Sequence, residues 1–163
     1  MSDLVQDVLA LAAQYEPRRI LAVGDVAEDM LRHYQATPSP DIHIVPADHP
    51  LRRLPASQQY DFALIAGTLE RLPAADGAML MARLRDVQAQ RFAVIVREDC
   101  THPATRWQRD DFIGLGLSVY GHYHAHGHPL MLCTYDIANY KRTPDWLNPR
   151  HWANPELWDK YRW

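Results

Sequence analysis

Residues 60–72 read YDFALIAGTLERL, and this stretch decides the fold. Its apolar residues are consecutive rather than alternating, so we expect residues 60–66 to form a strand that is buried on both faces. Strands covered on both faces are typical of α/β proteins, in which helices lie on either side of a mainly parallel sheet. The sequence therefore predicts an α/β core around this segment.

Three further apolar runs flank this stretch. Segments whose apolar residues recur at helical spacing lie between the runs. Strands are predicted at residues 19–24, 42–46 and 91–97, and helices at 3–15, 26–34, 74–88 and 107–115. Asp25 is the expected N-cap of the second helix, and Glu28 would complete a capping box. The expected buried side of the third helix consists of Met79, Leu80, Ala82, Leu84 and Val87. Strands that alternate with helices imply right-handed crossovers and parallel pairing.

The pattern changes after the fourth helix. Residues 117–123 and 130–135 are two apolar segments joined through Gly127-His128-Pro129, which predicts an antiparallel hairpin at one edge of the sheet. We therefore predict a three-layer α/β domain over residues 1–140, mostly parallel with this edge hairpin. A tryptophan-rich arm is predicted over residues 141–163.

The predicted arm has an unusual composition. It contains two Asn-Pro pairs that can each start a short helical turn, five basic and three acidic residues, and four tryptophans: Trp146, Trp152, Trp158 and Trp163. Four solvent-exposed tryptophans would form a large apolar patch on the surface. We therefore expect the arm to pack on its own domain or on a partner, such as the second subunit of a homodimer. Stacking on a base or a sugar is the alternative.

Composition excludes several classes of protein. The 163 residues suit one domain, and 47% apolar residues exclude disorder. A net charge of −3 argues against a nucleic-acid partner, which requires a basic face. No apolar run is long enough to cross a membrane, so no membrane association is expected. The two cysteines, Cys100 and Cys133, are typical of a reducing compartment, and we expect a cytoplasmic protein.

Several of these segments together resemble the class I S-adenosylmethionine-dependent methyltransferases. They are the strand that ends at Gly24 and its helix, the 60–72 stretch, and RFAVIVRE at 91–98. The middle stretch is similar to that family's aromatic–Asp–apolar strand and Leu-Glu-His-Leu turn, with Arg71 in place of the histidine. The resemblance covers residues 15–136. It implies a Rossmann-like fold with a reversed last strand, shortened because only one crossover fits between the second and third strands.

The resemblance also implies a cofactor site. It places S-adenosylmethionine among Gly24, Asp25, Asp48, Ala66 and Gly67. The first loop has one glycine where the family has several, and the acid after the second strand comes late, behind a proline. We therefore expect weak cofactor binding in a degenerate relative that acts as a binding or assembly module. The alternative is an active S-adenosylmethionine-dependent methyltransferase that acts on a small molecule or a protein.

Three other chemical groups are candidates. Glu70 could be a base beside the cofactor, although a capping or solvated role is the commoner one. Cys100 and His102 follow the fourth strand, but two residues so close in sequence indicate a nucleophile only weakly.

A run of histidines is the last candidate, and it could make the chain a metal-binding protein. The run alternates along the predicted hairpin: His122, His124, His126 and His128. On a strand, His122 and His124 would share a face and could chelate zinc. The turn near Gly127 would remove the other two, and a third ligand would have to come from His102 or Cys100. A solvated hairpin is the commoner structure, and we expect no stoichiometric metal.

Overall fold

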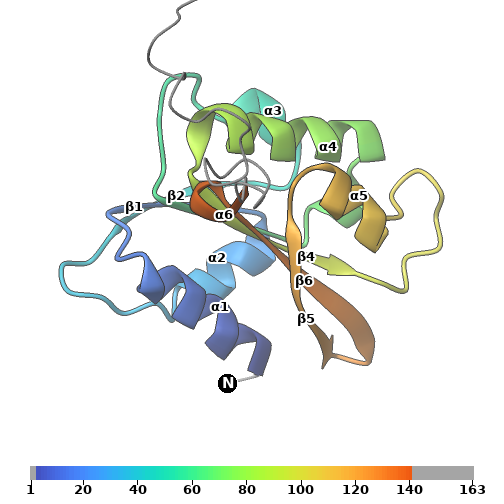
Figure 1. The fold of residues 1–163 in the computed structure, drawn as a ribbon, viewed down its shortest axis with the longest axis horizontal. Coiled ribbons are helices and arrows are strands. Elements are labelled where there is room, and N and C mark those ends of the chain that lie inside the picture. The colour runs from blue at the N-terminus through green and yellow to red at the C-terminus, as the bar shows by residue number, and fades with distance from the viewer. Residues whose placement is uncertain (1–2, 141–163) are drawn as a thin grey trace, which may run out of the picture.

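The structure is a computed structural model that describes residues 3–140, and it shows one mixed sheet with helices on both faces (Figure 1). The strands are β1 (Arg19–Val23), β2 (Asp41–Val45), β3 (Phe62–Ala66), β4 (Arg91–Arg97), β5 (Ser118–Ala125) and β6 (His128–Asp136). The α-helices are α1 (Asp3–Gln14), α2 (Asp25–Leu31), α3 (Pro50–Arg53), α4 (Ala74–Arg83), α5 (Arg109–Gly114) and α6 (Ile137–Tyr140). A 3-10 turn, η1 (Leu69–Arg71), follows β3, and a π-helical turn, η2 (Leu84–Gln88), continues α4.

The sheet confirms the predicted topology. Its order is β2-β1-β3-β4-β6-β5, and the first four strands in this order pair in parallel. β6 pairs antiparallel with both β4 and β5, so the hairpin closes one edge. Its two-residue turn is His126-Gly127, both with positive φ, one residue earlier than the sequence predicted. The chain is α/β and Rossmann-like over the described residues, and the expected arm at 141–163 lies outside them.

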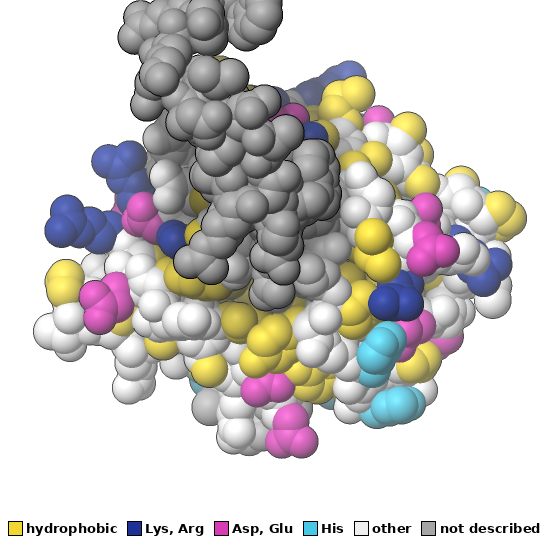
Figure 2. Space-filling view, in the orientation of Figure 1, with side chains coloured by type: hydrophobic (Ala, Val, Ile, Leu, Met, Phe, Trp, Pro, Cys, Tyr) yellow, Lys and Arg dark blue, Asp and Glu magenta, His cyan; other side chains and the backbone are white. Residues whose placement is uncertain are grey.

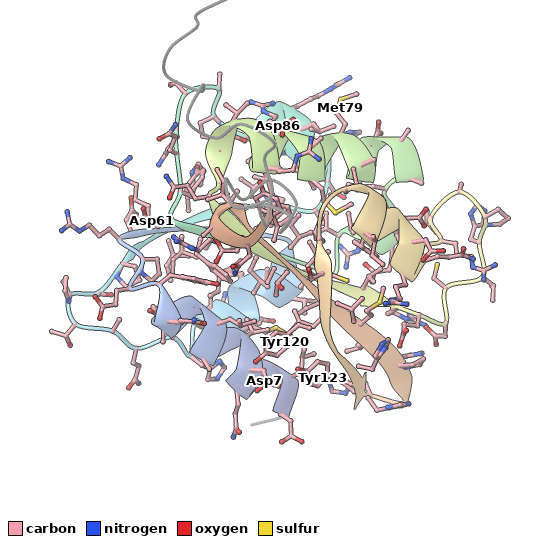
Figure 3. All side chains as sticks on the ribbon, viewed as in Figure 1. Asp7, Asp61, Met79, Asp86, Tyr120 and Tyr123 are labelled. Carbon is pink, nitrogen blue, oxygen red and sulfur yellow. The ribbon has the colours of Figure 1, made fainter. Side chains whose placement is uncertain are left out.

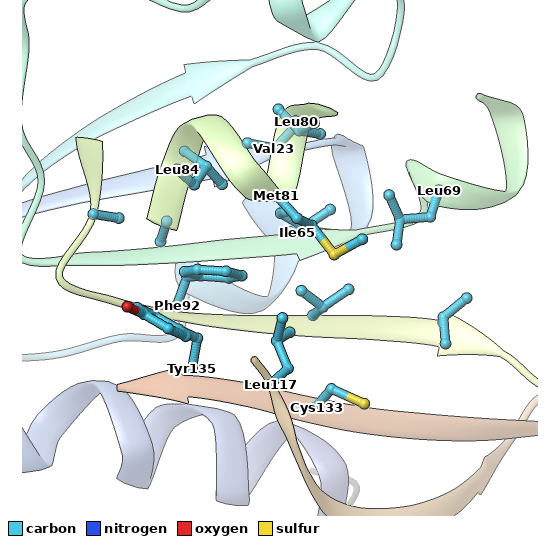
Figure 4. Close-up of a cluster of buried hydrophobic side chains, with 14 of the residues drawn as sticks. Val23, Ile65, Leu69, Leu80, Met81, Leu84, Phe92, Leu117, Cys133 and Tyr135 are labelled. Carbon is cyan, nitrogen blue, oxygen red and sulfur yellow. The ribbon is translucent and has the colours of Figure 1, made fainter. Parts of the chain in front are cut away.

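Two apolar layers cover the sheet. α1 and α2 pack on one face through side chains such as Val8 and Leu31, and α4 and α5 cover the other through Leu80 and Phe112. Every residue of β3 is buried, as its consecutive apolar residues predict. Figure 4 shows the second layer, in which Ile65 of β3 lies among side chains of α4, β4 and β6.

The predicted buried side of the helix at 74–88 is partly wrong. Leu80 and Leu84 are buried as expected, but Met79 and Val87 are 60% and 54% exposed. The buried side of α4 instead runs through Gly77, Leu80 and Met81 at helical spacing. From Leu84 onward the helix widens to π geometry, whose longer turn directs Val87 outward and buries Gln88.

The predicted cap of α2 is also wrong. The N-cap is Gly24, and no side chain caps the helix; Asp25 is the first helical residue. The first helical bond runs from the Glu28 N–H to the Gly24 carbonyl, at 3.1 Å. The Glu28 carboxylate therefore pairs with Arg32 one turn later, at 2.6 Å, and does not reach back to the cap.

No helix within residues 3–140 is long and apolar enough to cross a membrane.

Candidate functional site

The candidate site lies at the carboxyl ends of the parallel strands. The chain moves from β1 outward to β2, then crosses back to β3 and on to β4, so the order reverses between β1 and β3. Open α/β sheets bind ligands at such a reversal, outside the carboxyl ends of the strands. The loop after β1 begins at Gly24 and the loop after β3 begins at Gly67, and these two loops are neighbours because β1 and β3 pair directly.

The two loops touch at Gly24. Its φ of 98° and ψ of 156° lie in a region that favours glycine. A Cβ added there would lie 2.3 Å from the Ala66 carbonyl oxygen and 2.4 Å from Thr68 Oγ1. Thr68 is fully buried, and its hydroxyl donates a 3.0 Å hydrogen bond to the Val23 carbonyl. The one glycine of the first loop is therefore packed against the end of β3.

Two more contacts join the loops. Val26 lies over Gly67, with its Cγ2 only 2.7 Å from the position of an added Cβ. Arg71 Nη2 lies 3.3 Å from Asp25 Oδ2, and both side chains are more than half exposed, so this ion pair stabilises the contact by less than about 1 kcal/mol. Four of the five predicted cofactor residues, namely Gly24, Asp25, Ala66 and Gly67, are thus brought together, with Gly24 against Ala66 and Asp25 near Gly67.

The fifth predicted cofactor residue, Asp48, lies apart from these contacts. It is exposed on the segment between β2 and α3. Its carboxylate forms no hydrogen bond or ion pair with any residue of the described part of the chain.

Glu70 ties the loop after β3 to the end of β4. Its Oε1 accepts a 2.9 Å hydrogen bond from the Arg97 backbone N–H. Its Oε2 is buried and has no hydrogen-bond partner within residues 3–140. Glu70 is therefore neither a helix cap nor a solvated side chain, and Arg97 is a residue of this site that the sequence analysis missed.

A cavity of about 300 Å³ lies beside Glu70, between α2, β4 and the hairpin. Its walls are apolar and consist of Val26, Met30, Ile95, Ala125 and Leu130. Gly67, one of the predicted cofactor residues, lines it too, and Glu70, Arg71, Arg97, His126 and His128 complete its lining. We call this space the apolar cavity. A wider hollow of about 530 Å³ adjoins it through Glu70 and Arg97.

Three side chains beside the apolar cavity, Arg97, Asp99 and His128, pair with one another. Arg97 binds Asp99 through two nitrogens, at 3.0 and 3.2 Å, and His128 Nδ1 lies 2.6 Å from the same carboxylate. Hydrogen bonds from Arg97 and His128 lower the pKa of Asp99 to about 2. These three side chains satisfy one another. The apolar walls, and Glu70 Oε2 without a partner within residues 3–140, are the features open to a ligand.

The histidine run does not form a metal site in the described residues. His122 Nδ1 lies 3.0 Å from Glu98 Oε1, His124 is exposed, and His126 is in the turn. No group of three His, Cys, Asp or Glu side chains within residues 3–140 could hold a metal ion. Glu98 and Asp99, directly after β4, are the partners of His122 and His128, since β4 and the hairpin are adjacent.

Cys100 and His102 both line the wider hollow. Cys100 Sγ lies 3.4 Å from Thr105 Oγ1, and His102 Nδ1 accepts the Ala104 N–H at 3.3 Å. Each therefore pairs with its own loop, and the two form no hydrogen bond with each other in the described structure.

The fold is similar to solved S-adenosylmethionine-dependent methyltransferases. One is the 1,6-didemethyltoxoflavin-N1-methyltransferase of Burkholderia thailandensis, solved with S-adenosylhomocysteine (TM-score 0.53, 13% identity, 82% of this chain and 77% of that chain). Another is an S-adenosylmethionine-dependent methyltransferase from Aquifex aeolicus (TM-score 0.53, 12% identity, 80% and 88%). An rRNA methylase from Escherichia coli matches less well (TM-score 0.47, 17% identity, 82% of this chain), and this chain spans 64% of its length. At 13% and 12% identity, the first two matches show likeness of fold alone.

No curated protein matches the chain by sequence. A family model does, and it covers residues 2–163, almost the whole chain. The chain therefore belongs to DUF6231, a family of unknown function whose fold, in this member, is that of the class I methyltransferases.

Proposed function

We propose that this domain is a binding module of methyltransferase-like fold that does not transfer methyl groups, and that its ligand site is the apolar cavity. One observation carries the proposal. The loops after β1 and β3, between which the resemblance places the cofactor, are in contact with each other at Gly24 and Thr68.

The contact works against S-adenosylmethionine at the place where the resemblance puts it. Entry of the cofactor between the loops would break the Thr68 hydrogen bond, lift Val26 from Gly67 and part Asp25 from Arg71. A buried hydrogen bond contributes about 1 kcal/mol and an exposed ion pair less. Opening the loops therefore costs about 2 kcal/mol, which weakens binding roughly 30-fold. The first loop has a single glycine, so few of its backbone groups can approach the cofactor closely and offset this cost.

The apolar cavity supports a different ligand. Its volume of about 300 Å³ lies at the small end of ligand sites, and such sites are mostly apolar with a few polar groups. Arg97, Asp99 and His128 on its rim already pair with one another, so most of the gain on binding comes from covering the apolar walls, and Glu70 Oε2 offers one acceptor to a donor on the ligand. The site suits a compact, uncharged and largely apolar molecule.

Isothermal titration with S-adenosylmethionine and with S-adenosylhomocysteine tests the first half of the proposal. We expect dissociation constants in the high micromolar range or weaker, near −5 kcal/mol. Sub-micromolar binding of either compound would refute the proposal. It would favour the alternative, an active methyltransferase that acts on a small molecule or a protein.

An NMR titration with indole as the probe tests the second half. Amide shifts are expected at Val26, Ile95 and Leu130, which line the apolar cavity. Ala125→Phe places a ring in the cavity and should abolish these shifts. Ala13→Phe, at an exposed position of α1, is the matched control and should leave them unchanged. Equal shifts in both variants, or none in the unmodified protein, would refute this ligand site.

A further inference from the structure

A second hollow lies at the other end of the hairpin. β6 begins at the rim of the apolar cavity and ends at a groove of about 770 Å³ between α1, α5 and the hairpin. We call it the α1–α5 groove. Its lining includes Leu11, Tyr15, Ile113, Tyr120, Asp136 and Asn139. We infer that this groove is the docking surface of the chain's own C-terminal segment, residues 141–163.

The α1–α5 groove exposes apolar side chains that no other residue of the described range 3–140 covers. Ile113 and Tyr120, which both line it, are each 48% exposed. Large exposed apolar side chains that gather in one hollow mark an interaction surface. Figure 3 labels Tyr120 on the hairpin beside α1, and Figure 2 shows apolar side chains gathered on this face of the molecule.

The C-terminal segment is the nearest candidate for the α1–α5 groove because the chain enters it beside the groove. Asn139 of α6 lines the groove, and the C-terminal segment begins two residues later. The 23 residues of the segment carry four tryptophans, which supply the aromatic area that such a surface needs. A segment tethered at the wall of a groove meets that groove at a high effective concentration, whereas a separate partner does not.

The charge of the C-terminal segment and the polar lining of the groove both favour docking of the segment there. Residues 141–163 hold five basic and three acidic side chains, and residues 1–140 hold twelve basic and seventeen acidic ones. Asp136 of the groove accepts a hydrogen bond from the Tyr15 hydroxyl and pairs with Arg91. Gln14, Ser118, Thr134 and Asn139 add uncharged polar groups to the lining, and buried indole N–H groups require acceptors of this kind.

The test uses the full chain and two matched variants. Tyr120→Asp puts a charge in the groove, and Met79→Asp makes the same kind of change at a 60% exposed position of α4, well away from it (Figure 3). In Tyr120→Asp the docking equilibrium constant should fall about 30-fold, which is about 2 kcal/mol. Acrylamide quenching of tryptophan fluorescence should then increase. Trp107 is 6% exposed and supplies a constant background.

A second measurement follows the backbone. The segment offers trypsin several cleavage sites, including Lys141 and Arg150. Cleavage there should be faster in Tyr120→Asp than in Met79→Asp, while the melting temperatures show that both variants are folded. Equal quenching and cleavage in the two variants and the unmodified protein would overturn the inference. Protection confined to a species of twice the chain mass, by light scattering, would also overturn it and assign the groove to a second copy's segment. Neither outcome depends on whether S-adenosylmethionine or indole binds.

Discussion

Replacing Gly24 by alanine tests the contact on which the proposed function rests. The change adds one methyl group at a residue whose φ is 98°, where side chains are strained whatever the space. The methyl would also lie 2.3 Å from a backbone oxygen and 2.4 Å from Thr68 Oγ1, far inside van der Waals distance. A backbone atom cannot rotate aside as a flexible side chain can, so the end of β3 has to shift.

Two costs add at this position. A non-glycine residue in such a conformation costs about 1–3 kcal/mol. Overpacking against fixed neighbours costs a further 1–3 kcal/mol. We expect Gly24→Ala to lower the free energy of unfolding by about 3 kcal/mol, which in a chain of this size lowers the melting temperature by about 6–12 °C.

Alanine substitutions at two other glycines distinguish the cost of the backbone conformation from the cost of overpacking. Gly127 also has a positive φ, 79°, but nothing lies within 4 Å of an added Cβ, so alanine there should cost only about 1–2 kcal/mol. Gly114, the exposed last residue of α5, has neither problem, and alanine should be neutral or stabilising by up to about 1 kcal/mol. Thermal and urea unfolding followed by circular dichroism measure all three. If Gly24→Ala melts within about 2 °C of Gly127→Ala, the loops do not pack as described and the reasoning fails.

Other measurements test other parts of the structure. Burial raises the pKa of the Cys133 thiol to about 12, so a thiol reagent at pH 8 should label only Cys100 until the protein is unfolded; two reactive thiols in the native protein would contradict the packing of β6. The folded pKa of Asp99, about 2, lies below its ordinary value, so its ionised form stabilises the fold above about pH 4, and this advantage over Asp99→Asn should vanish as the pH falls to 2. After dialysis against a chelator we expect no stoichiometric zinc, and one equivalent that His124→Ala releases would contradict this. Removal of residues 143–163 should lower the melting temperature or the soluble yield, and unchanged stability would contradict docking of the segment.

The strands were predictable because they are consecutive apolar runs between helical segments. β3 and β4 are buried on both faces, which requires consecutive apolar residues, so the local sequence is enough to identify them as central strands. The hairpin followed from a change of pattern. Its turn was displaced by one residue because a positive φ at His126 has no sequence signature as strong as a glycine.

The candidate site was predictable only in outline. The sequence indicates that Gly24 and Gly67 each come at the end of a strand, but not that these two strands pair or that Thr68 and Val26 bridge the loops after them. Those contacts depend on how closely the two loops approach, and that distance is a property of the packed sheet. Likewise, the bond from the Arg97 N–H to Glu70 joins residues 27 positions apart, and nothing near either residue in sequence indicates it.

The two apolar layers share no residue, since the sheet lies between them. Leu64 and Ile65 are adjacent in β3 yet belong to different layers, so truncating both should give additive losses in a double-mutant cycle, although they are sequence neighbours. The walls of the apolar cavity, including Ile95 and Leu130, belong with the layer under α1 and α2. We therefore expect substitutions in the layer under α4 and α5 to leave the shape of the proposed ligand site unchanged.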